Sequence, residues 1–349
     1  MSVQPVAEDG RESMHDKPII AIATGDAAGI GAETALKTAL DPTVDAACRP
    51  VLVSDPLLLE RHAKACGIDT GLRPVERVSD ADWSDGRLNV LAAPHPKAAA
   101  LAFGVTHAAS GRASLAFARR AIHAALAGDV DAVVAAPQNE TAIALAGIAF
   151  DGHPSFVARE TGSDENDVYL MLCVGDLKIA HTTLHQSVRQ AIASITQDKV
   201  QRAIRATDRV LKQLGIEQPR IAVSGLNPHA GEGGLFGSEE VEIIRPAIDA
   251  AAVEGYGVTG PFGADTMFHK QDVDAFIVML HDQGHVPAKL LAPHATIALT
   301  IGTPILFASV AHGSAHDIAG KGTADPKAMI EAVLLLSRVT RKLAQPQRA

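Results

Sequence analysis

The chain has 349 residues, of which 47% are hydrophobic, and its formal net charge is −9. This length predicts two domains, and the hydrophobic fraction is sufficient for a sizeable core. The negative charge and the aromatic content of 3% argue against a nucleic-acid partner, because nucleic acids are bound by basic surfaces and stacking rings. Cys48, Cys66 and Cys173 lack paired spacing, so neither disulfides nor a cysteine-based zinc site is predicted.

The first 16 residues are polar and acidic and lack the basic and apolar regions of a signal peptide. We therefore expect residues 1–16 to form a disordered lead-in and the protein to be cytoplasmic. The most apolar long run, residues 290–310, is interrupted by proline, histidine and glycine and breaks into strand-sized pieces. No membrane span is predicted there.

Short β-branched runs alternate with alanine-rich helical patterns along the chain. Strands are predicted at residues 18–23, 50–53, 132–136, 170–174, 177–183, 220–224, 275–280 and 298–301. Between them, residues 114–127 and 199–214 show apolar faces with the period of a helix. This mostly βαβ order predicts an α/β fold with mainly parallel pairing. No linker separates two halves, so we expect the two domains to be interwoven.

Two glycine-bearing loops follow predicted strands. Residues 24–33 open a helix, but their glycine spacing is not the GxGxxG pattern of a dinucleotide-binding turn, so we do not place a cofactor there. Residues 225–234 contain four glycines, which let the backbone approach a ligand closely. The alternative for this second loop is a flexible surface turn. Its buried-looking flanks favour a ligand-binding loop.

Three histidines stand at the ends of predicted elements. His281 follows the apolar run 275–280, His153 opens a helix-like segment, and His185 follows the strand-like residues 177–183. Imidazoles in such positions suggest a metal site, but they lack the spacing of a CxxC or HExxH motif. The alternative is that these are surface or capping residues, in a chain that holds 15 histidines. His181 and His229 are not assigned to the metal.

The segment that starts at His281 contains further side chains that could act in catalysis. Asp282, His285 and Lys289 lie within the same nine residues, where a buried strand ends and a cleft is expected. Alternative roles exist for single residues: Asp282 as a helix cap, Lys289 as a surface amine and Arg112 as a surface charge.

The chain resembles the 4-hydroxythreonine-4-phosphate dehydrogenase (PdxA) family over about residues 18–340. The resemblance rests on stretches that occur in the family's order: GDAAGIGAE, GHPSF, GLNPHAGEGGLFG, GPFGADTMF, HDQGHVPAK and HGSAHDIAGKG. It implies the two-domain fold of the isocitrate and isopropylmalate dehydrogenases, with a cleft between the domains. Residues 17–137 and 290–345 would form the first α/β domain with part of the NAD site. Residues 138–289 would form the second, with the metal site and the contacts of a homodimer.

The resemblance also implies site residues. A divalent metal would be held by His153, His185 and His281, one of them from the partner subunit, so the active site would lie at the subunit interface. Three imidazoles suit zinc, which we favour, and also cobalt, nickel or iron. Active-site positions would be Asp265, Asp282 and Lys289, with Lys289 as an acid/base and Asp282 as either a base or a residue that orients His281. NAD, with NADP left open, would contact Asn227, Gly231, His312, Gly313, Ser314, Ala315 and Asp325.

Three departures from the family bear on the substrate. Members that use phosphate esters have a lysine in place of Glu140, an asparagine in place of Ala298 and an arginine in place of Phe307. Losing two cations and gaining an anion disfavours a phosphorylated substrate. Within the family, terephthalate cis-dihydrodiol dehydrogenases act on an unphosphorylated dicarboxylate, and the NETAIALAGIAF, HTTLHQSVR and HDQGHVPAKLLAP stretches resemble theirs.

The leading prediction is therefore an NAD- and metal-dependent oxidative decarboxylation of a carboxylated cis-dihydrodiol to a catechol. Asn139, Glu140 and Arg112 are the candidate substrate contacts. One alternative is a dehydrogenase of a 4-phosphohydroxy acid, such as 4-hydroxythreonine, threonate or erythronate 4-phosphate. The other is a catalytically silent protein that binds a metal and a nucleotide.

Overall fold

The structure is a computed structural model that describes residues 17–95, 97, 100–292 and 295–344. The predicted lead-in, residues 1–16, lies outside the described residues. Within the described ranges, no helix is both long enough and apolar enough to cross a membrane.

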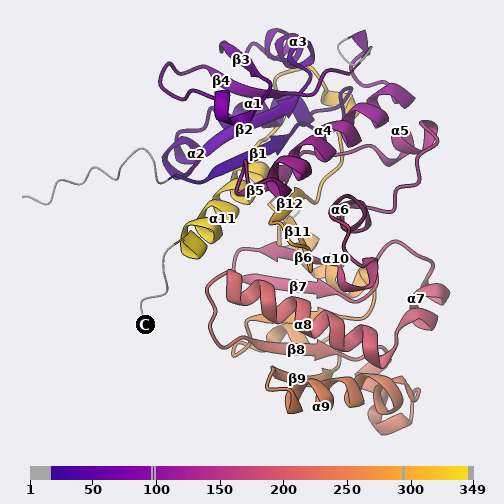
Figure 1. Cartoon of the computed structure of the whole chain (residues 1–349). Coiled ribbons are helices and arrows are strands. Elements are labelled where there is room, and N and C mark those ends of the chain that lie inside the picture. The colour runs from indigo at the N-terminus through magenta and orange to yellow at the C-terminus, as the bar shows by residue number, and fades with distance from the viewer. Residues whose placement is uncertain (1–16, 96, 98–99, 293–294, 345–349) are drawn as a thin grey trace, which may run out of the picture.

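The first part of the chain alternates strands and helices, as Figure 1 shows from indigo to magenta. Its strands are β1 (Ile19–Ala23), β2 (Arg49–Ser54), β3 (Leu72–Val75), β4 (Leu88–Ala92) and β5 (Ala132–Ala135). Its helices are α1 (Gly31–Ala39), α2 (Pro42–Ala47), α3 (Pro56–Cys66), α4 (Ala108–Leu126), α5 (Glu140–Leu145) and α6 (His153–Thr161).

The rest of the chain adds further strands and helices, joined by short helical turns such as η4 (Pro228–Gly234) and η7 (His316–Ile318). The strands are β6 (Tyr169–Val174), β7 (Leu177–His181), β8 (Arg220–Ser224), β9 (Gly257–Phe262), β10 (Ala275–Val278), β11 (Ile297–Ile301) and β12 (Phe307–Val310). The helices are α7 (Val188–Ser194), α8 (Gln197–Gln213), α9 (Arg245–Val253), α10 (His281–Leu291) and α11 (Lys327–Ala344).

The described strands form one sheet, in the order β3-β4-β2-β1-β5-β12-β11-β6-β7-β10-β8-β9. All neighbouring pairs are parallel except β12 with β11, β11 with β6 and β6 with β7. The predicted α/β class with mainly parallel pairing is confirmed. The predicted strand ends were too long, because residues 182–183 form a bend and a loop and residues 279–280 lead into α10.

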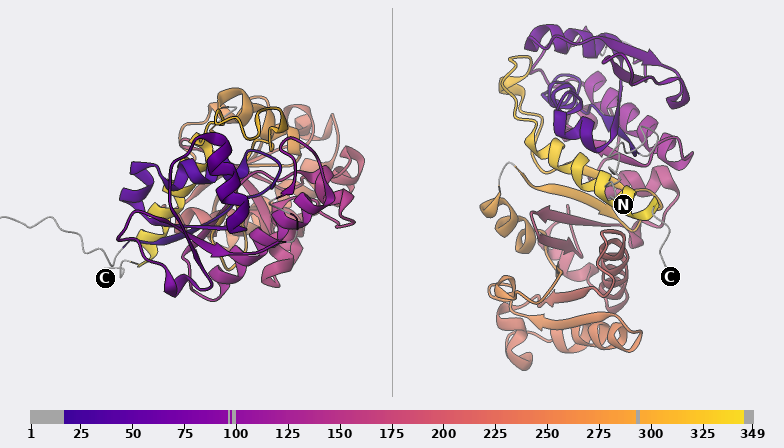
Figure 2. Two further views of the ribbon diagram at one scale, coloured as in Figure 1. Left: turned by 90° about the horizontal axis from the view of Figure 1, so that it is seen from above. Right: turned by 90° about the vertical axis from the view of Figure 1, so that its left-hand side faces the viewer.

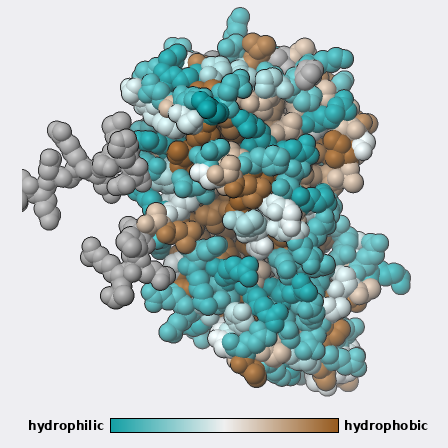
Figure 3. All heavy atoms as spheres, viewed as in Figure 1, coloured by the Kyte–Doolittle hydropathy of each residue, from teal (hydrophilic) through white to brown (hydrophobic). Residues whose placement is uncertain are grey.

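Both faces of the sheet are covered, as is usual for parallel strands. On β1, Ile20 and Ile22 pack into one core cluster with α1 and α11, whereas Ala21 and Ala23 pack into another with α4. The C-terminal segment returns to the N-terminal half of the sheet, because β12 pairs with β5 and α11 packs against both strands (Figure 2). Apolar side chains reach the surface in the middle of the face shown in Figure 3.

Candidate functional site

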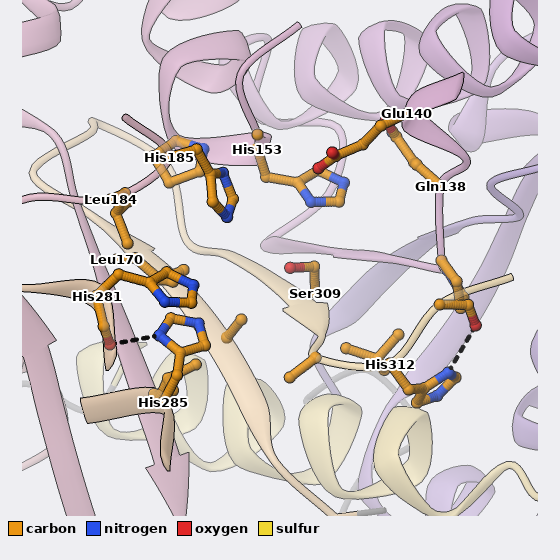
Figure 4. A pocket seen from close by; sticks show the side chains of 18 of the residues that line it. Gln138, Glu140, His153, Leu170, Leu184, His185, His281, His285, Ser309 and His312 are labelled. Carbon is orange, nitrogen blue, oxygen red and sulfur yellow. Dashed lines mark hydrogen bonds between the residues drawn. The ribbon is translucent and has the colours of Figure 1, made fainter. Parts of the chain in front are cut away.

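A cavity of about 310 Å³ lies where β5, β6, β11 and β12 meet the start of α6 and α10 (Figure 4). Its polar wall comes from residues far apart in the sequence. These are Gln138 and Glu140 after β5, His153 at the start of α6, His185 after β7, His281, His285 and Lys289 on α10, and Ser309 and His312 at the end of β12. The cavity therefore brings together the three predicted metal ligands and Lys289.

Two of these histidines have their Nδ1 atoms occupied. His281 Nδ1 lies 2.7 Å from Asp282 Oδ1, and His185 Nδ1 lies 3.0 Å from the carbonyl oxygen of Asp151. The two rings are 5.6 Å apart between centroids. An Nδ1–H group that donates to an oxygen leaves the Nε2 lone pair for a metal, which is the usual arrangement of a metal-binding histidine.

His153 has a different environment. Its ring lies between Phe150 and Phe307, at centroid distances of 5.9 Å and 5.4 Å. Its Nε2 atom is buried and has no hydrogen-bond partner in the part of the chain that the structure describes. Burial lowers the pKa of His153 to about 4, so the ring is neutral at pH 7. A buried neutral imidazole with no partner is a group that a metal ion would satisfy.

The ring nitrogens of these three histidines are thus suitable ligands for a divalent metal ion. The side chains do not converge, however: within the described residues, no group of three or more histidine, cysteine or acidic side chains is placed to hold a metal ion. The described residues of one chain therefore do not complete a metal site by themselves.

A second pair of histidines lies behind the first. His181 ends β7 and is buried, with its Nε2 atom 3.1 Å from His285 Nδ1. Burial, together with the neighbouring imidazole of His285, lowers the pKa of His181 to about 3. Burial, followed by the charge of His281, lowers the pKa of His285 to about 4. Gly284 permits this packing, because a Cβ atom there would lie 2.3 Å from His181 Nε2.

The predicted NAD residues are divided among several places. His312 and Gly313 line the cavity. Ser314 is buried beside the first glycine loop, where its carbonyl oxygen accepts a hydrogen bond from Ile30 N at 2.9 Å. Ala315 has a φ of 40° and so turns the chain sharply. Asp325 is exposed, and its Oδ1 accepts a hydrogen bond from Lys327 N at the start of α11.

The loop after β8 does not reach the cavity. Asn227 Nδ2 donates to Glu239 and Glu240 at 2.7 Å and 2.9 Å, so its amide is held by carboxylates 12 and 13 residues further along the chain. Gly231 is buried with a φ of 76°, beside the Glu240 carboxylate. Asp265 is exposed and also lies outside the cavity wall.

The three predicted substrate contacts are also separated. Glu140 lines the cavity, but Asn139 caps α5 by accepting a hydrogen bond from Ala142 N at 2.9 Å, and its Nδ2 atom lies 3.2 Å from His316 Nε2. Arg112 is exposed on α4 and lies outside the cavity wall. The Asp282 carboxylate is 85% exposed and faces His281 from outside the cavity.

Sequence reasoning missed Gln138. Its side chain lines the cavity, and both amide atoms are buried without a partner among the described residues. A buried unpaired amide is destabilising unless a ligand or water satisfies it. The only signal in the sequence was its place directly after a predicted strand, which many loop residues share.

Known proteins are similar to this chain over most of its length. The family model described as "Pyridoxal phosphate biosynthetic protein PdxA" matches residues 46–336. The chain belongs to the PdxA family. The D-threonate 4-phosphate dehydrogenase of Cupriavidus necator is 39% identical to it over 90% of this chain and 95% of its own length.

Two solved PdxA-family structures are also similar. The 4-hydroxythreonine-4-phosphate dehydrogenase of Klebsiella pneumoniae has a TM-score of 0.83 at 36% identity, covering 93% of this chain and 99% of its own. The terephthalate 1,2-cis-dihydrodiol dehydrogenase of Burkholderia xenovorans has a TM-score of 0.66 at 41% identity, covering 92% and 98%. The names of these PdxA relatives agree on dehydrogenase activity and differ in substrate.

Proposed function

We propose that the chain is an NAD-dependent, divalent-metal-dependent dehydrogenase of a hydroxy acid. The observation that carries this proposal is the cavity, which gathers His153, His185, His281 and Lys289 beside the His312–Gly313 backbone. We further propose that residues 17–137 with 290–345 and residues 138–289 form two domains, and that a homodimer completes the metal site. The names of the PdxA relatives support the dehydrogenase activity.

The residues of the cavity have distinct proposed roles. His153, His185 and His281 would hold the metal, which as a Lewis acid would lower the pKa of a bound hydroxyl, and NAD would accept the hydride. Lys289, on the same helix as His281, is the candidate to take the hydroxyl proton. The Asp282 carboxylate would hold the His281 ring in one tautomer through its 2.7 Å contact with Nδ1.

For the substrate, the comparisons favour a 4-phosphohydroxy acid, which was the alternative, over a carboxylated cis-dihydrodiol, which was the leading prediction. The D-threonate 4-phosphate dehydrogenase matches nearly the whole chain, and the 4-hydroxythreonine-4-phosphate dehydrogenase superposes with the higher TM-score, 0.83 against 0.66. We therefore propose a 4-phosphohydroxy acid as the substrate. Lys289 is the cation that lines the cavity within the described residues and would meet its negative charge.

A carboxylated cis-dihydrodiol is the second candidate, and one observation favours it. Glu140 places a carboxylate in the cavity wall, and Phe307 is 1% exposed and packs against His153, so neither position offers a cation to a phosphate. On this substrate, oxidation of the ring hydroxyl beside the carboxylated carbon would leave a β-keto acid. That acid would lose carbon dioxide and become a catechol.

The deciding experiment measures NADH formation by the zinc-loaded protein with threonate 4-phosphate and with a terephthalate-type dihydrodiol. We expect the phosphorylated acid to have the higher kcat/KM. Faster turnover of the diol, with carbon dioxide equal to NADH, would overturn this substrate and establish the second candidate. If neither compound, nor 4-hydroxythreonine or erythronate 4-phosphate, gave NADH, the catalytically silent alternative would replace the proposed function.

A further inference from the structure

His285 lies one helical turn after His281 on α10, and its ring lines the cavity. The two rings are stacked at 3.7 Å between centroids, with an angle of 9° between their planes (Figure 4). The residue is 9% exposed, and the titratable groups around it are His181, His185, His281 and Lys289. The His285 ring is therefore packed against two other imidazoles, those of His181 and His281, at the wall of the cavity.

The hydrogen bonds of the pair define which nitrogen of each ring carries the proton. His181 Nδ1 lies 3.4 Å from the carbonyl oxygen of Leu170, which can only accept, so His181 has its proton on Nδ1 and a lone pair on Nε2. His285 Nδ1 then faces two acceptors, His181 Nε2 at 3.1 Å and the His281 carbonyl oxygen at 3.2 Å. His285 therefore has its proton on Nδ1, and its Nε2 atom keeps a lone pair.

This lone pair is not available to the metal that His281 would hold. A metal–imidazole bond is about 2 Å long and lies in the plane of the ring. Because the planes of His281 and His285 are nearly parallel and their centroids lie 3.7 Å apart, their Nε2 lone pairs do not meet at one atom. His285 is thus a cavity residue with an acceptor nitrogen and no metal to bind.

We propose that His285 Nε2 accepts a hydrogen bond from a hydroxyl of the substrate, on the carbon next to the one that is oxidised. This inference rests on the proposed function and specifies its substrate as a compound with two neighbouring hydroxyls. A carboxylate or a dianionic phosphate is disfavoured at this position, because it has no proton to donate to the lone pair. His285 therefore orients the substrate and selects compounds that have two neighbouring hydroxyls.

The first test needs no substrate. In protein with ¹⁵N-labelled histidine, measured at pH 7 without metal and with zinc, the ring signals that disappear in His285→Leu belong to His285. We expect a protonated Nδ1 and an unprotonated Nε2 in both states. A proton on Nε2, or on both nitrogens, would overturn the inference whether or not the enzyme oxidises the proposed substrates.

The second test compares kcat/KM for the best substrate and for its analogue without the neighbouring hydroxyl. The wild-type enzyme should prefer the hydroxylated compound at least about tenfold, which is the value of one good hydrogen bond. His285→Leu should reduce this preference to about twofold or less. His285→Gln, which can return an acceptor oxygen near the position of Nε2, should restore part of it.

Metal content distinguishes His285 from the proposed metal ligands. His285→Leu should retain bound zinc at the wild-type level, whereas His281→Ala should lose it. Zinc loss in His285→Leu, or an unchanged preference for the hydroxyl, would overturn the inference. If neither the wild-type enzyme nor the variants oxidised any substrate, the proposed function would fail while the tautomer of His285 would still be measured.

Discussion

Glu140 is the residue that most directly opposes an anionic substrate. It is the first residue of α5, where a carboxylate is favoured by the helix dipole, and its side chain is exposed in the cavity wall. Glu140→Lys removes a negative charge and adds a positive one beside the substrate. A dianionic phosphate gains more from this change than a monoanionic carboxylate does.

We expect Glu140→Lys to raise the ratio of kcat/KM for threonate 4-phosphate to that for the dihydrodiol by about fivefold to tenfold, a size typical of partly solvated charge pairs. Glu140→Gln should have an intermediate effect. Glu217→Lys makes the same charge change at an exposed position outside the cavity and should leave the ratio unchanged. An unchanged ratio in Glu140→Lys would show that this side chain does not face the substrate.

His62, on α3, gives the structure an acid-sensitive contact away from the proposed metal. The ring is fully buried, its Nε2 atom donates to the Ala27 carbonyl oxygen at 3.1 Å, and its Nδ1 atom has no partner among the residues that the structure describes. Burial lowers the pKa of His62 below its usual value. Protonation would place a second, unpaired N–H group in the core.

The pKa of His62 is lower in the folded protein than in the unfolded chain, where it is about 6.5. At pH values between these two pKa values, the unfolded chain binds more protons than the folded protein. The stability from the neutral ring is therefore complete above about pH 6.5 and falls as the pH drops toward the lowered pKa. Urea unfolding at pH 7, 6 and 5 should show a smaller loss of stability in His62→Gln than in the wild type. The exposed His269→Gln control should lose as much as the wild type, and equal losses in all three proteins would contradict this role.

At the scale of elements, the strands that were predicted are mainly those in the middle of the sheet. Strands such as β1, β5 and β10 are buried on both faces and have continuous apolar sequences. The missed strands β3 and β9 are the two edges of the sheet, where Pro74, Gly257 and Pro261 are tolerated. The missed β4 contains Asn89, whose amide is paired with Asp82 backbone atoms, so its polarity concealed a buried strand. The missed β12 lies in the middle of the sheet, between β5 and β11, and has only four residues.

The site residues that could be predicted are those with a metal-binding or titratable side chain close to the end of a predicted element. His153, His185, His281 and Lys289 met this condition, and they line one cavity. Gln138 could not be found in this way, because a single amide after a strand resembles any loop residue. The placement of Arg112 and Asn227 outside the cavity depends on the packing of whole elements, which the local sequence does not encode.

Gly111 determines how closely α4 approaches α5, the helix that carries Glu140. It lies within α4, and a Cβ atom there would be 2.3 Å from the carbonyl oxygen of Ala142, a backbone atom. Alanine is about 1 kcal/mol better than glycine inside a helix, but overpacking against a backbone typically costs about 1–3 kcal/mol. The clash should therefore outweigh the gain in helix propensity.

Gly111→Ala should lower the free energy of unfolding by about 1–2 kcal/mol in urea titrations and reduce kcat/KM by moving the wall that holds Glu140. The adjacent, exposed Arg112→Ala provides the control, since it adds no atom between the helices. Its stability should remain within about 0.5 kcal/mol of the wild type. An equal or higher stability of Gly111→Ala would mean that α5 shifts easily, and the wall would not be rigid.

For the whole molecule, the surface around the site supports the proposed homodimer. A hollow of about 340 Å³ beside the cavity is lined by Val188 of α7 and by His281 and Asp282 of α10. Apolar side chains on these helices are exposed, with Val188 at 65%, Leu290 at 79% and Leu291 at 67%. Apolar surface next to an incomplete metal site is where a second subunit that adds a ligand would bind.

A subunit-mixing experiment tests this arrangement. His153→Ala, His185→Ala and His281→Ala should each be inactive, and they are mixed in pairs under conditions that exchange subunits. If two ligands come from one chain and the third from its partner, two of the three mixtures should recover activity. The third mixture should stay inactive, because its two substitutions remove ligands that belong to the same chain. Recovery should reach roughly a quarter of the wild-type activity, since half of the dimers are mixed and each has one complete site.

The pattern of recovery also identifies the shared ligand. His185 and His281 lie 5.6 Å apart between ring centroids within one chain, and His153 lies across the same cavity, so geometry alone permits more than one division. The mixture that stays inactive names the two ligands of one subunit. Native mass spectrometry must show that mixed dimers have formed. If all three mixtures stayed inactive despite mixed dimers, the metal would be held within single chains, and the proposal of a site completed by the partner subunit would be wrong.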